Sequence, residues 1–124
     1  ADFLLPTAYL KKGPRDDALE AFRKVADANM KTRNGSEAQY RVAELLFDAG
    51  KTGEAEAEIL KFADVNTSHQ YWLAKAFLLL GDIYVKKGDD FQAKATYESI
   101  VDGYTATDDG IAEEAHRKLE NLKK

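Results

Sequence analysis

Gly50, Lys51 and Thr52 have the ending of a phosphate-binding loop, in which backbone N–H groups and a lysine hold the phosphates of a nucleotide. The complete motif requires another glycine five residues before Gly50, and that position is Leu45. It also requires a preceding strand, whereas the apolar residues around Leu45 recur with helical spacing. We therefore expect a turn between two helices here and no nucleotide site.

The segment 105–116 (TATDDGIAEEAH) has the acidic residues and central glycine of a calcium-binding loop. When Gly110 is aligned with that glycine, Thr105 and Thr107 stand where carboxylates belong, and His116 replaces the terminal glutamate. Asp109 is instead well placed to begin a helix, because a carboxylate there accepts hydrogen bonds from free backbone N–H groups. We expect a helix start and no bound metal.

The sequence also lacks the residue patterns that nucleophilic or acid–base catalysis usually requires. The chain has no cysteine, and its two histidines, His69 and His116, lie far apart in the sequence without a metal-ligand or triad spacing. Three pairs of carboxylates precede expected helices, where negative charge favours the helix dipole: Asp16-Asp17, Asp89-Asp90 and Asp108-Asp109. We expect no enzyme activity and no cofactor.

The composition describes one folded domain. The 124 residues are 44% hydrophobic and 32% charged, with a net charge of −4 and a pI near 5.2. The negative charge disfavours nucleic acid as a partner. The longest apolar run, Ala76 to Leu80, is too short to span a membrane.

Three stretches of the chain share one spacing of apolar and glycine residues. The steps within each unit are +4, +4, +5, +4 and +3, which are helical periods interrupted by a turn at one fixed glycine. The three sets are Leu5, Tyr9, Gly13, Ala18, Phe22, Val25; Val42, Leu46, Gly50, Ala55, Ile59, Phe62; and Leu80, Tyr84, Gly88, Ala93, Tyr97, Ile100. Each unit is thus expected to be a helix–turn–helix.

The prolines and the helix-capping residues predict about seven helices and no strand. The first either begins at Pro6 or is a short stump, and Pro14 suits the first turn of the second. Later helices are expected at 36–48, 52–64, 68–87, 90–102 and 110–122. Ser36, Thr52, Asp89 or Asp90, and Asp109 are the expected N-caps, and Thr67 and Gln70 have the spacing of a capping box. We expect a single domain, 1–124, with units at about 5–30, 36–65 and 68–105 and a capping helix at 109–122.

The repeated residues resemble the tetratricopeptide repeat, a 34-residue helix–turn–helix unit. The third unit is most similar, since Leu80-Gly81 supplies the Leu-Gly pair and Tyr84, Gly88 and Ala93 follow in register. The resemblance implies an all-α, right-handed solenoid of antiparallel helix pairs that binds protein or peptide. A narrower likeness to the C-terminal region of long bacterial envelope proteins of this class implies a periplasmic location.

The helix expected at 68–87 is apolar on almost every side, so we expect it at the centre of the stack. Trp72 and Phe77 should then each be more than about four-fifths buried. The last helix alternates Ile111, Ala115, Leu119 and Leu122 with charged residues, which predicts a closed C-terminal end with Arg117 and Lys118 in solvent.

The resemblance implies that a peptide or helix binds on the concave face, formed by the first helix of each pair. The second unit contributes Tyr40, Arg41, Glu44, Phe47 and Asp48, and the third contributes Lys75, Leu78, Asp82, Val85 and Lys86. Tyr40 and Phe47 either contact a ligand or pack against the next helix. As an alternative function, exposed Phe3, Leu4 and Leu5 would mediate stacking or self-association as the end of a longer array.

Overall fold

In the computed structural model, residues 14–104 and 109–123 are described, and these form helices and no strand. The helices are α2 (Pro14–Ala28), α3 (Arg33–Asp48), α4 (Thr52–Val65), α5 (Gln70–Lys86), α6 (Asp90–Gly103) and α7 (Ile111–Leu122). The helix expected from Pro6 lies outside the described residues. The all-α prediction is confirmed, and so is the placement of the later helices to within a few residues.

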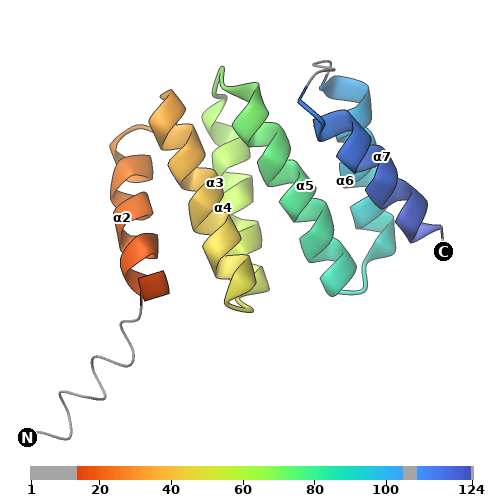
Figure 1. Ribbon diagram of the computed structural model, residues 1–124, viewed down its shortest axis with the longest axis horizontal. Helices are drawn as coiled ribbons and strands as arrows, with labels where there is room; N and C mark the ends of the chain where they lie inside the picture. The colour runs from red at the N-terminus through yellow and green to blue at the C-terminus, as the bar shows by residue number, and fades with distance from the viewer. Residues whose placement is uncertain (1–13, 105–108, 124) are drawn as a thin grey trace, which may run out of the picture.

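The helices form a row of antiparallel pairs. In Figure 1, α3, α5 and α7 stand side by side, with α4 and α6 behind them. Helix α3 packs against α2, α4 and α5, whereas α5 packs against α3, α4, α6 and α7. The prediction that the apolar helix α5 is the centre of the stack is therefore confirmed.

The repeated glycines end equivalent helices. Gly50 and Gly88 have φ of 82° and 81°, in the left-handed region that favours glycine. After α3, the N–H groups of Lys51 and Gly50 bond the carbonyls of Leu46 and Phe47, both at 2.9 Å. The same pair of bonds follows α5. This is a Schellman ending, so the fixed glycine in the repeat has a conformational cause.

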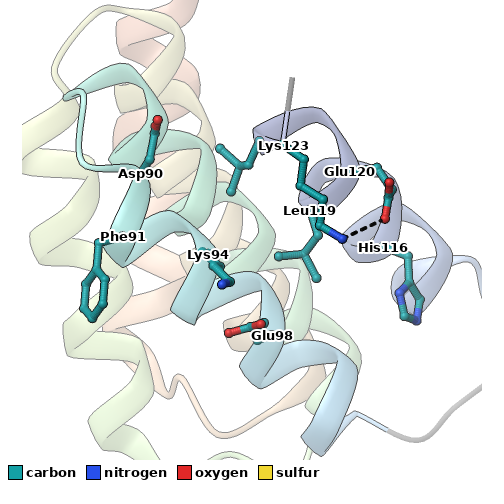
Figure 2. Close-up of a pocket in the computed structure, with 9 residues that line it drawn as sticks. Asp90, Phe91, Lys94, Glu98, His116, Leu119, Glu120 and Lys123 are labelled. Atoms are coloured by element: carbon teal, nitrogen blue, oxygen red, sulfur yellow. Dashed lines mark hydrogen bonds and ion pairs between the residues drawn. The ribbon is translucent and has the colours of Figure 1, made fainter.

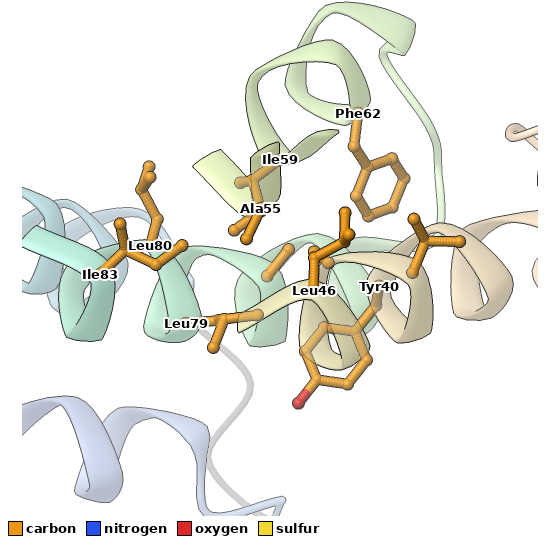
Figure 3. Packing of buried hydrophobic residues seen from close by; sticks show 11 residues of the cluster. Tyr40, Leu46, Ala55, Ile59, Phe62, Leu79, Leu80 and Ile83 are labelled. Carbon is orange, nitrogen blue, oxygen red and sulfur yellow. The ribbon is translucent and has the colours of Figure 1, made fainter. Parts of the chain in front are cut away.

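The repeated apolar positions form the core. Leu46, Ala55, Ile59 and Phe62 lie in one buried cluster, and Ala93, Tyr97 and Ile100 lie in a second. Figure 3 shows Ile59 and Phe62 directed from α4 toward the adjacent helices. Helix α4 therefore packs across α3 and α5, and α6 packs across α5 and α7, as stacking of repeats requires.

Two of the predicted helix starts are wrong. Thr32, not Ser36, caps α3, and its Oγ1 accepts a hydrogen bond from the Gly35 N–H at 3.0 Å. Ser36 is instead buried inside the helix, where its hydroxyl bonds the Met30 carbonyl at 2.7 Å and lies 2.9 Å from Thr67 Oγ1. Lys51, without a side-chain cap, precedes α4.

The other predicted helix starts are confirmed only in part. Thr67 Oγ1 accepts from the His69 N–H and Gln70 donates to the Thr67 carbonyl, so the two residues interact but do not form the predicted capping box. Asp89 caps α6 as predicted, because it accepts a hydrogen bond from the Gln92 N–H. Asp109 accepts from the Ile111 N–H, but the N-cap of α7 is Gly110.

The prediction that α5 is covered on every side is wrong. Tyr71 and Val85 of this helix are 37% and 42% exposed. Trp72 and Phe77 are partly buried, and both pack against the main core cluster. One side of α5 thus remains open to solvent.

Candidate interaction surface

Helices α3, α5 and α7 together line one surface of the protein, here called the inner face. It contains a hollow of about 370 Å³ whose lining includes Phe47 of α3, Asp82 and Val85 of α5, and Lys118 and Leu122 of α7. The structure thus brings together Phe47, Asp82 and Val85, which were predicted from separate repeat units. Lys118 and Leu122 were missed because α7 was interpreted only as a cap.

At the other end of the inner face, the sequence candidates form a cluster of aromatic and charged side chains. The Arg41 guanidinium carbon lies 5.4 Å from the Tyr40 ring centroid and 5.6 Å from that of Trp72. Arg41 Nη1 and the Tyr40 hydroxyl both donate to Glu44, at 3.0 and 3.1 Å. Lys75 Nζ lies 5.6 Å from the Tyr40 ring. Cation–π contacts and ion pairs thus link the side chains of this cluster.

Two lysines of α5 lie over aromatic rings on this face. Lys75 contacts the rings of Tyr40 and Tyr71, and Lys86 Nζ lies 5.4 Å from the Phe47 ring centroid. Neither lysine forms an ion pair with another described residue, whereas neighbouring Arg41 pairs with Glu37 and Glu44. Both ammonium groups therefore remain able to pair with a carboxylate of a ligand.

A polar cluster forms the floor of the hollow. The Tyr97 hydroxyl donates to Asp82 Oδ1 at 2.5 Å, and Lys118 Nζ bonds the two oxygens of Asp82 at 2.9 and 3.1 Å. Lys118 also pairs with Glu114. The prediction that Lys118 lies free in solvent is wrong, because it links α7 to α5. Arg117 is exposed, as expected.

A family model for the tetratricopeptide repeat-like domain matches residues 1–124. The chain belongs to this family. The resemblance deduced from the repeated residues is therefore confirmed. Comparisons with curated proteins and with solved structures found no match.

Not all candidates in this tetratricopeptide repeat-like domain reach the inner face. Leu78 is 4% exposed and belongs to the core cluster around α6 and α7, so it is not available to a ligand. Tyr40 is 7% exposed, which makes it mainly a packing residue. Phe47 is partly buried and Asp48 is exposed. Phe3, Leu4 and Leu5, which would carry end stacking, lie outside the described residues.

Within residues 14–104 and 109–123, no three His, Cys, Asp or Glu side chains come together as a set of metal ligands. Over the same ranges, no helix combines the length and apolar character needed to cross a bilayer.

Buried Tyr97 should make the protein less stable at alkaline pH. Burial raises the pKa of Tyr97, and the hydrogen bond and charge of Asp82 raise it further. In the unfolded chain the pKa of a tyrosine is about 10, so above pH ~10 deprotonation favours the unfolded chain. The contribution of Tyr97 to the free energy of unfolding is therefore complete below pH ~10 and decreases above it, by up to about 1.4 kcal/mol per pH unit. Urea unfolding should show a smaller decrease between pH 10 and 11 in Tyr97→Phe. Equal slopes in the two proteins would contradict this assignment.

Proposed function

We propose that this domain is a protein-interaction module that binds a peptide or helix of its partner on the inner face, without catalysis. A domain of the tetratricopeptide repeat-like family is in general a scaffold for protein interactions. The observation that supports this particular face is the pair Lys75 and Lys86, which lie over aromatic rings and have no carboxylate partner among the described residues.

The positions of these lysines define the kind of ligand that fits. They are eleven residues apart on α5, which corresponds to about three helical turns and about 16 Å along the axis. In an extended peptide that distance separates residues about five positions apart. The hollow beside Phe47 and Val85 offers an apolar contact near Lys86. We therefore propose a ligand with two acidic residues at that spacing and an apolar residue adjacent to one of them.

The proposal is tested by selecting peptides from a random phage-displayed library on the full chain. Binding of the selected peptides is then measured through the fluorescence of Trp72, the single tryptophan, whose ring lies tilted against Tyr40 and edge-to-face against Tyr71. We expect an acidic consensus and a loss of affinity of about tenfold in Lys75→Glu/Lys86→Glu, because attraction becomes repulsion at two sites.

A matched control is the variant Lys24→Glu/Lys31→Glu. It makes the same change in net charge at two exposed lysines outside the inner face. This variant should bind the selected peptides as the wild type does. Equal losses in both double variants would show a nonspecific charge effect and would contradict a site on the inner face.

A further inference from the structure

On the side of α6 and α7 away from the inner face, a groove of about 450 Å³ lies between the two helices (Figure 2). Its apolar lining consists of Phe91, which is 81% exposed, together with the partly buried Leu119 and Leu122. Charged residues of both helices, including Lys94, Glu98 and Glu120, form its edges. Within the described residues, this side of α6 and α7 therefore presents an apolar strip to solvent.

Two repeats earlier in the chain, the equivalent position is occupied by a helix. Ala18 and Ala93 occupy the same repeat position, 75 residues apart, so α6 corresponds to α2 and α7 to α3. Helix α4 packs along α3 and forms ion pairs with α2. Among the described helices, none takes the corresponding place against α6 and α7.

The ion pairs between α4 and α2 specify which charges an occupant needs. Glu58 Oε2 lies 3.5 Å from Arg23 Nη1, and Lys61 Nζ lies 4.0 Å from Asp27 Oδ1. The residues 75 positions after Arg23 and Asp27 are Glu98 and Asp102, so the edge of α6 is acidic at both places. Both are exposed and form no ion pair within the described residues.

We propose that the groove between α6 and α7 binds an amphipathic helix of a partner protein, with two basic residues three positions apart along the edge that faces α6. The apolar side of this helix covers Phe91, Leu119 and Leu122. Its basic residues pair with Glu98 and Asp102. This groove shares Leu122 with the hollow on the inner face, but its other lining residues differ and its function does not depend on ligand binding there.

The probe is a synthetic peptide with the sequence of α4, residues 52–65, constrained as a helix by a covalent staple and carrying Glu58→Lys. This change places lysines at positions 58 and 61 of the peptide, opposite Glu98 and Asp102. Titration into the isotopically labelled full chain, followed by NMR, should shift backbone signals of α6 and α7 to saturation. The unmodified peptide, with glutamate at 58, should bind about fivefold more weakly, because an ion pair is replaced by repulsion.

Charge reversal on the protein distinguishes this site from nonspecific adhesion. Glu98→Lys changes an exposed residue, so the fold is retained, and it should reverse the preference in favour of the unmodified peptide. Lys75→Glu/Lys86→Glu should leave the affinity for the lysine peptide unchanged, whereas Leu119→Glu should weaken both peptides. Absence of saturable binding, signal shifts confined to α3 and α5, or an unchanged preference in Glu98→Lys would overturn the proposal.

Discussion

Phe62→Ala is expected to lower the free energy of unfolding by about 3–5 kcal/mol, the range for removing a buried phenylalanine ring. Phe62 is fully buried in the cluster that joins α4 to α3 and α5, where it packs with Leu46 and Ile59. A domain of this size is stable by about 5–15 kcal/mol, so the loss is a large part of the total. Urea unfolding followed by circular dichroism and by Trp72 fluorescence measures it.

Leu60→Ala is the matched control on the same helix. Leu60 is 46% exposed, so its truncation removes little buried surface and should cost well under half as much. If the two variants lose similar stability, the core is not packed around the repeated position that Phe62 occupies. Because α4 holds α3 beside α5, Phe62→Ala should also weaken ligand binding on the inner face in proportion to the unfolded fraction.

The helices and turns could be predicted because their causes are local. The glycine at the end of α3 or α5 must adopt positive φ, and the apolar residues on either side recur at helical spacing. Ser36 was misassigned because its role depends on Thr67, 31 residues away, which a local capping rule does not see. Thr32, four residues before Ser36, caps α3 by accepting a hydrogen bond from the Gly35 N–H.

The inner face could be predicted only in part. Helical projection places Tyr40, Lys75 and Lys86 on the side where the structure has them, since residues three, four or eleven apart share a helix face. It fails for Leu78, because the turn of α5 about its own axis is determined by contacts with α6 and α7. The contribution of Lys118 follows from its pairing with Asp82, 36 residues away, and no sequence signal marks it.

Gly81 is a residue for which the sequence indicates a small side chain and the structure shows why. An added Cβ would lie 2.2 Å from Cε1 and 2.6 Å from Cζ of the Tyr97 ring, far inside contact distance. That ring is 2% exposed, and its hydroxyl is bonded to Asp82, so it has no room to move away. The contact therefore determines how closely α6 approaches α5.

Gly81→Ala should destabilise the protein by about 2–3 kcal/mol through overpacking, although alanine alone favours a helix by about 1 kcal/mol. Gly53→Ala is the matched control, because no atom lies within 4 Å of an added Cβ there, and it should leave stability unchanged or raise it. In a Tyr97→Val background the ring atoms are absent, so Gly81→Ala should become neutral or stabilising. The double-mutant cycle, measured by urea unfolding, gives the coupling directly. If Gly81→Ala costs the same with and without the ring, the close approach of the two helices is not what requires glycine at this position.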